Sequence, residues 1–125
     1  MKDIAEKLVK AEQQMSDEKG RFLLFALFLR EDAPDLWDLL VSADWIEANK
    51  GEALRYITGI LKSVVEPIEL SKLSRIVIIE QTNPALGAIQ SAFHIEHSVA
   101  DVQSSNFFGL QIKHAYIITS RREGT

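Results

Sequence analysis

The feature that most constrains this chain is a run of four consecutive β-branched residues, Ile76–Ile79, between Arg75 and Glu80. β-branched side chains lose little freedom in a pleated strand, whereas they crowd the preceding turn of a helix. A run without polar alternation indicates a strand that is covered on both faces, as in a parallel sheet. We therefore expect a strand over residues 75–81, with helices packed on the sheet that contains it.

A second short apolar segment, residues 36–43, has the same character, because only Asp38 and Ser42 interrupt it. It predicts another two-sided strand, although its leucines and alanine leave a helix as the competing interpretation. Residues 47–65 carry apolar side chains three and four positions apart, the spacing of an amphipathic helix, and a proline opens a short helical turn over 67–73. Strand–helix–strand connections are normally right-handed crossovers, so the two strands should be parallel and central.

The N-terminal residues, about 3–31, are expected to form a long helical region. Apolar residues recur there at alternating spacings of four and three, which is a period of 3.5 residues. The series consists of Ile4, Leu8, Ala11, Met15, Phe22, Phe25 and Leu29, and Glu18 interrupts it. Gly20 is a weak point, since glycine inside a helix costs about 1 kcal/mol. The unbroken register nevertheless favours one rod or two nearly collinear helices.

The C-terminal part alternates between polar and apolar residues over 93–99 and 110–119, which predicts two strands with one solvent-exposed face each. Asparagine and glycine in the link between them are typical of a hairpin turn. Asn83 and Pro84 predict the start of a short helix that ends near Ser91. The expected fold class is α/β, with α+β character: one domain, 1–125, with helices on a mixed four-stranded sheet. Two parallel strands should be central, and the C-terminal hairpin antiparallel.

Composition excludes several classes of protein. The chain has no cysteine, which rules out disulfides, thiolate nucleophiles and cysteine metal sites. The formal net charge of -4 argues against nucleic-acid binding, and the adjacent Arg121 and Arg122 are usually interpreted as a solvated tail. The charged N-terminus is not a signal peptide, and the longest apolar run is too short to span a membrane. We therefore expect a cytoplasmic protein without a membrane partner or cofactor.

Sequence motifs for nucleotide binding, zinc proteolysis and serine hydrolysis do not occur. A site is more plausible at the carboxyl ends of the parallel strands, where open α/β sheets bind ligands. Asp44 and Glu80 could hold a divalent metal there. Ser42, Thr82 and Asn83 could hold a phosphate or carboxylate at a helix N-terminus. Alternatively, Asn83 caps the following helix, and Ser42 or Asp44 caps the helix after the first strand.

The histidines are a second candidate site. If Ser105 and Asn106 form a two-residue turn, His97 lies directly opposite His114, with Cβ atoms about 5 Å apart, and His94 lies on the other face. A three-residue loop would separate the pair. Two imidazoles need a third ligand to hold a metal, and none can be named, so no metal site is predicted. The alternative is two partly buried, hydrogen-bonded histidines.

Two functions are consistent with these patterns. The favoured one is a non-enzymatic association module that acts as a homodimer. A helix over the apolar run would need cover on more than one side, and a second copy could supply it through Phe22, Phe25 and Leu29. Alternatively, this helix is central in its own subunit, between the sheet and helix 47–65. The second function is a metal- or anion-dependent enzyme, such as a phosphate-ester hydrolase, at the strand ends.

Overall fold

The computed structural model describes residues 1–33, 35–107 and 110–123. These residues form a mixed α/β fold with helices packed on a five-stranded sheet. In chain order the elements are α1 (Lys2–Lys19), β1 (Leu24–Leu29), β2 (Trp37–Ser42), α2 (Asp44–Ala48), α3 (Lys50–Val64), α4 (Pro67–Leu70), β3 (Leu73–Ile78), α5 (Pro84–Ala92), β4 (Ala100–Phe107) and β5 (Leu110–Ser120). The predicted fold class is confirmed, with five strands in place of four.

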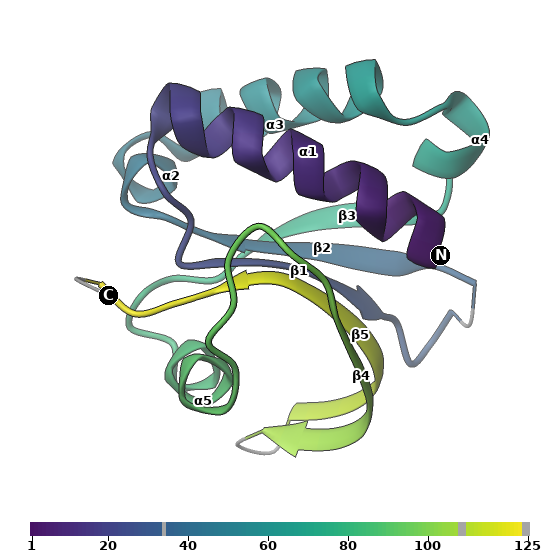
Figure 1. Ribbon diagram of the computed structural model, residues 1–125, viewed down its shortest axis with the longest axis vertical. Helices are drawn as coiled ribbons and strands as arrows, with labels where there is room; N and C mark the ends of the chain where they lie inside the picture. The colour runs from purple at the N-terminus through teal and green to yellow at the C-terminus, as the bar shows by residue number, and fades with distance from the viewer. Residues whose placement is uncertain (34, 108–109, 124–125) are drawn as a thin grey trace.

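The sheet has the strand order β3-β2-β1-β5-β4, and of its neighbouring pairs only β2 and β3 are parallel. Helices α1 and α3 cover one face, whereas α5 lies on the other, where the β4–β5 hairpin curls round it (Figure 1). Each face therefore has its own apolar core. No helix in the described ranges is both long and apolar enough to cross a membrane.

Helix α1 ends at Gly20, and the helical region expected over residues 3–31 is therefore wrong beyond Lys19. Glycine is favoured at this position because its φ of 130° is one that residues with a side chain rarely adopt. The Gly20 carbonyl also accepts a hydrogen bond of 2.9 Å from Trp45 Nε1, which ties the turn to α2. Within α1 the predicted apolar series is confirmed, since Leu8 and Met15 are fully buried.

The apolar run after α1 forms β1, a central strand between β2 and β5. Leu27 packs into the core beneath α1 and α3, and Phe28 packs into the core on the α5 side. A strand between two cores needs apolar residues on both faces, so the run is two-sided strand and not all-round apolar helix. Phe22 and Phe25 are fully buried in their own chain and Leu29 partly so. The helix that was expected to present these three residues to a second copy is not formed.

The strands predicted over residues 36–43 and 75–81 correspond to β2 and β3, and they are parallel as expected. Helices α2 and α3 together replace the helix predicted over residues 47–65, and α4 forms within 67–73. β3, however, is at the edge of the sheet, because β1 pairs with the other side of β2. Side chains Ile76–Ile79 are consequently half-buried, not covered on both faces.

The strand predicted over residues 110–119 is confirmed as β5, but its second face is buried at Ala115, Ile117 and Thr119 and not solvent-exposed. The strand predicted over 93–99 is wrong. These residues form a loop that touches the sheet through an isolated bridge between Ile95 and Ser120. His97 in this loop has a φ of 56°, in the left-handed region, which a regular strand cannot contain. The antiparallel partner of β5 is the later segment β4.

Candidate functional site

The residues expected at the carboxyl ends of the parallel strands make separate contacts. Ser42 is buried; its carbonyl accepts a 2.7 Å hydrogen bond from the Leu23 amide, and its Oγ has no hydrogen-bond partner. Asp44 begins α2, and its Oδ1 accepts a 2.7 Å hydrogen bond from Gln81 Nε2. These contacts connect the end of β2 to the start of β1 and to the segment after β3.

The candidate residues after β3 are also satisfied within the chain. Glu80 forms an exposed ion pair with Lys50, with 2.6 Å between Oε1 and Nζ. The Oδ1 atom of Asn83 accepts a 2.9 Å hydrogen bond from the Ala85 amide, which confirms the predicted cap of α5, and Thr82 is exposed. Among the described residues, no three acidic or histidine side chains gather in a way that could hold a metal ion. A metal or phosphate site here stays a prediction that these contacts do not favour.

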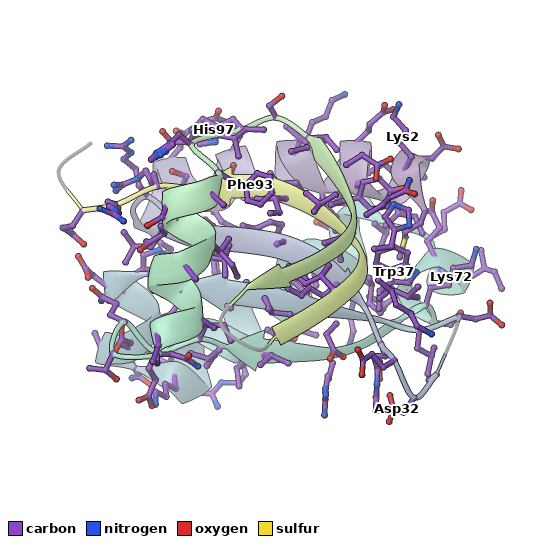
Figure 2. All side chains as sticks on the ribbon, turned by 90° about the horizontal axis from the view of Figure 1, so that it is seen from below. Lys2, Asp32, Trp37, Lys72, Phe93 and His97 are labelled. Atoms are coloured by element: carbon purple, nitrogen blue, oxygen red, sulfur yellow. The ribbon has the colours of Figure 1, made fainter. Side chains whose placement is uncertain are left out.

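The pairing of His97 with His114 is wrong, because the register of the hairpin differs from the expected one. β4 extends beyond the expected turn, and Gln103 faces His114. His114 Nε2 lies 2.7 Å from Asp101 Oδ1, and its ring meets Trp37 edge-on, with centroids 5.2 Å apart. Trp37 and His97 lie on different sides of the molecule in Figure 2. The two imidazoles therefore have unrelated surroundings.

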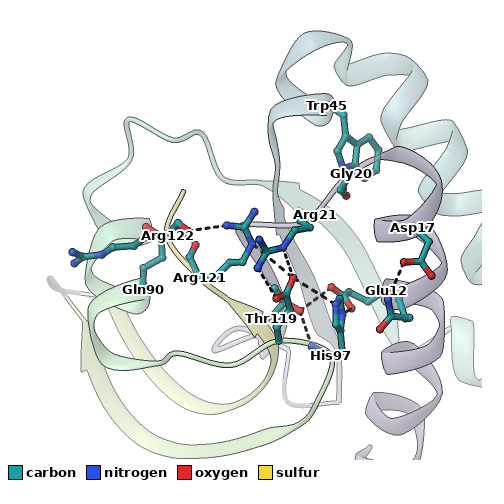
Figure 3. Close-up of polar contacts among 12 residues, drawn as sticks. Glu12, Asp17, Gly20, Arg21, Trp45, Gln90, His97, Thr119, Arg121 and Arg122 are labelled. Carbon is teal, nitrogen blue, oxygen red and sulfur yellow. Dashed lines mark hydrogen bonds and ion pairs between the residues drawn. The ribbon is translucent and has the colours of Figure 1, made fainter. Parts of the chain in front are cut away.

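His97 contacts Glu12 instead, a residue that the sequence patterns did not single out (Figure 3). The Glu12 side chain is fully buried beneath α1, and its Oε2 lies 2.5 Å from His97 Nδ1. Its Oε1 accepts a 2.8 Å hydrogen bond from Thr119 Oγ1 on β5. Thr119 Oγ1 in turn accepts a 3.2 Å hydrogen bond from the His97 amide. This closed arrangement joins α1, β5 and the loop before β4.

A signal for Glu12 is present in the sequence. Glu12 continues the row of Ile4 and Leu8 at a spacing of four, so helical geometry directs it towards the core. A carboxylate in such a row must find partners, because buried polar groups without hydrogen bonds are costly. Its partners could not be identified, since His97 and Thr119 are 85 and 107 residues further along the chain.

An ion-pair cluster adjoins the other ring nitrogen of His97. Glu96 Oε2 lies 3.5 Å from His97 Nε2. Arg21 donates two hydrogen bonds to Glu96, from Nε to Oε2 at 2.9 Å and from Nη2 to Oε1 at 2.7 Å. Arg121 Nε lies 3.7 Å from the same Oε2. Figure 3 shows Arg21 and Arg121 approaching from different chain segments, close to Thr119 and His97.

The two carboxyl groups near His97 have pKa values shifted in opposite directions. Burial raises the pKa of Glu12, against the effect of the hydrogen bonds with His97 and Thr119. The hydrogen bonds from Arg21 lower the pKa of Glu96. The contact with Glu12 directs His97 Nδ1 towards the interior, while 27% of the His97 side chain remains exposed. A carboxylate–imidazole pair of this kind can orient a histidine for proton transfer, provided that a substrate is held at Nε2.

The outer edge of β3 is a different kind of surface. β3 is the terminal strand of the sheet and pairs with β2 alone. On its helix side is a hollow of ≈ 400 Å³, lined largely by apolar side chains that include Leu54, Leu61, Leu70 and Ile76. On its other side a hollow of ≈ 480 Å³ combines charged residues with apolar ones, including Phe28, Leu40, Val77 and Ile79. The edge strand is thus flanked by partly apolar hollows on both faces.

Comparison of the chain with protein-family models, with curated proteins and with solved structures finds no match.

Proposed function

We propose that this protein is an association module that forms a homodimer through the outer edge of β3. The observation that carries the proposal is an edge strand whose C-terminal half and the residue after it, Ile76–Ile79, are all apolar and half-exposed. An open edge with apolar side chains is a template for pairing with another strand. Natural edge strands are usually protected by lysine, by proline or by being short. Residues Ile76–Ile79 contain neither lysine nor proline.

The charged residues beside this apolar stretch are neutralised within the chain. Arg75 Nε lies 3.0 Å from Asp38 Oδ1, and Glu80 pairs with Lys50. The charges of Arg75 and Glu80 are therefore compensated within each copy. Such side-chain pairs contribute little stability at an exposed surface, but they remove a barrier to self-association.

The second copy is the proposed occupant because the strand is complementary to itself. A twofold axis perpendicular to the sheet keeps each face on its own side, so residues that alternate onto the same face must meet. With the axis at Val77, Ile76 meets Ile78 of the second copy, and Ser74 meets Glu80. The central apolar residues then face one another, whereas Arg75 faces Ile79 of the second copy.

Backbone geometry supports the same register. The Ile79 amide donates to the Val41 carbonyl at 2.9 Å, and hydrogen bonding to one neighbour involves alternate residues of a parallel strand. The amides and carbonyls of Ile76 and Ile78 therefore point outward. Pairing Ile76 with Ile78 of the second copy satisfies these groups and continues the sheet across the dimer.

The test uses the absence of cysteine from the chain. In this register Val77 faces its own copy in a non-hydrogen-bonded pair with Cα atoms about 4.5 Å apart, within the range of a disulfide. We expect oxidised Val77→Cys to form a covalent dimer. The matched control is Ile79→Cys, on the same face of the strand but displaced from its own copy by four residues, or about 13 Å.

Sedimentation of the wild-type chain at micromolar concentration provides the second measurement. A monomeric wild type, or cross-linking of Ile79→Cys as readily as Val77→Cys, would contradict the proposal. Ile78→Lys should give a folded monomer, whereas Gln103→Lys on the opposite edge strand should remain dimeric. The cysteine variants keep the proposal testable if Ile78→Lys does not fold, since they replace half-buried apolar side chains by another uncharged one.

A further inference from the structure

Two guanidinium groups approach the carboxylate of Glu96. Arg21 and Arg121 come from segments 100 residues apart, and both guanidinium groups face the same Glu96 carboxylate. Arg21 binds it through two hydrogen bonds, the geometry in which arginine recognises carboxylate and phosphate. The Glu96 carboxylate thus lies between two arginines, on a chain whose net charge is -4.

Arg121 is positioned by the fold and is not part of a solvated tail. Its amide donates to the Leu23 carbonyl at 3.1 Å, and its carbonyl accepts a 2.7 Å hydrogen bond from Gln90 Nε2. The side chain is only 12% exposed, and its Nε is buried without a hydrogen-bond partner. A buried guanidinium N–H without an acceptor is costly, so this atom can donate to an oxyanion that takes the place of the Glu96 carboxylate, 3.7 Å away.

Space for a ligand exists beside these groups. A hollow of ≈ 260 Å³ is lined by Arg21, His94, Ile95, Glu96, Ser120 and Arg121. Glu96 belongs to the loop before β4, next to His97, whose left-handed φ of 56° is an unfavourable conformation for a residue with a side chain. Strained backbone of this kind occurs at sites where the surrounding contacts hold a functional geometry in place.

We propose that Arg21 and Arg121 form a binding site for a phosphate-type oxyanion, in which the Glu96 carboxylate occupies the position of the ligand. An incoming phosphate group would take the two Arg21 hydrogen bonds and the free Arg121 Nε–H. Glu96 competes with the ligand for Arg21 and repels it as a like charge. The ligand is either free phosphate or the phosphate group of a larger molecule.

The experiment is a titration with inorganic phosphate at constant ionic strength, followed by amide NMR. In the wild type we expect shifts in the amides of residues 94–97 and 120–122. Glu96→Gln removes the competing charge at contact distance and should strengthen phosphate binding by about tenfold or more. Arg21→Gln and Arg121→Gln should weaken it by about tenfold or more.

Arg30→Gln is the matched control, because Arg30 is also paired with a carboxylate, Asp32, but lies outside the hollow. It should bind phosphate like the wild type. Arg21 is half-exposed, so its variant keeps the test valid if Arg121→Gln does not fold. Absence of phosphate shifts from both the wild type and Glu96→Gln would overturn the proposal, and so would binding that Arg21→Gln leaves unchanged.

A parallel titration with phosphoserine distinguishes the two sources of the ligand. Binding of inorganic phosphate alone supports a site for the free ion. Binding of phosphoserine with the same shifted amides supports a site for a phosphorylated molecule.

Discussion

Replacement of Glu12 by alanine should destabilise the fold strongly. Glu12 is fully buried and holds two partners, Thr119 at 2.8 Å and His97 at 2.5 Å. Thr119 is itself fully buried, so alanine leaves its hydroxyl and the His97 Nδ1 without their partner. Leaving these two polar groups without their partner costs about 3–5 kcal/mol in total. For a domain of this length, about 4 °C per kcal/mol corresponds to a fall in melting temperature of about 12–20 °C.

Urea unfolding followed by circular dichroism measures this free energy, and two further variants isolate its cause. Glu12→Gln keeps an acceptor for Thr119 and an amide that can donate to His97, so we expect a loss of only about 1 kcal/mol. Glu6→Ala changes an exposed glutamate on the same helix, and its effect should be within about 0.5 kcal/mol. If Glu12→Ala is as stable as Glu6→Ala, the buried arrangement that joins α1 to β5 is refuted.

Two further predictions concern glycines and pH. Gly20→Ala should lose about 1–3 kcal/mol in urea unfolding, because φ is 130° and a Cβ would lie 3.3 Å from Trp45 Cδ1. Gly59→Ala should gain about 0.4–1 kcal/mol, since Gly59 lies within α3 with open space around it. Equal changes in unfolding free energy for the two variants would contradict the different backbone conformations of Gly20 and Gly59. Burial raises the pKa of Glu12, so its contribution to stability is lost as pH rises, and the stability deficit of Glu12→Gln relative to wild type should shrink as pH rises above 4.5. Arg21 lowers the pKa of Glu96, so the advantage of wild type over Glu96→Gln should instead disappear as pH falls below 4.5; pH-dependent melting that is the same in all three chains would contradict both.

The sequence pattern predicted correctly those elements that depend on residues a few positions apart. Helix α3 falls within the expected segment because it has one apolar side towards a core. Asn83 was identified as a helix cap from two neighbouring residues, and its hydrogen bond to the Ala85 amide is a local contact. Such features depend on residues a few positions apart, which a sequence displays directly.

The apolar run 22–29 was misassigned because an uninterrupted apolar run carries no period of its own. A helix buried on all sides and a central strand covered on both faces both require such a run. The apolar series of α1 also has a spacing that happens to continue through Phe22, Phe25 and Leu29. Gly20 contained the information needed, but its left-handed φ is visible only in the folded chain. Placing β1 at the centre of the sheet also moved β3 to the edge.

The candidate sites depended on contacts between distant segments. Ser42, Asp44, Glu80 and Asn83 were expected at strand ends and lie there. The side chains of Asp44, Glu80 and Asn83 have separate partners, and Ser42 is buried, so they form no shared site. The prediction that His97 faces His114 was wrong because the length of the turn sets the hairpin register. A small error in the turn changes every cross-strand neighbour.

By itself, the sequence determined the fold class, the parallel pair of β2 and β3, and most helices, because propensity and periodicity act over a few residues. Tertiary structure alone decided that β3 became an open edge, that Glu12 met His97 and Thr119, and that Arg21 and Arg121 converged on Glu96. The physical reason is that strand order and side-chain partners minimise the free energy of the whole chain at once. Contacts across about 100 residues therefore leave no local pattern from which they could be read.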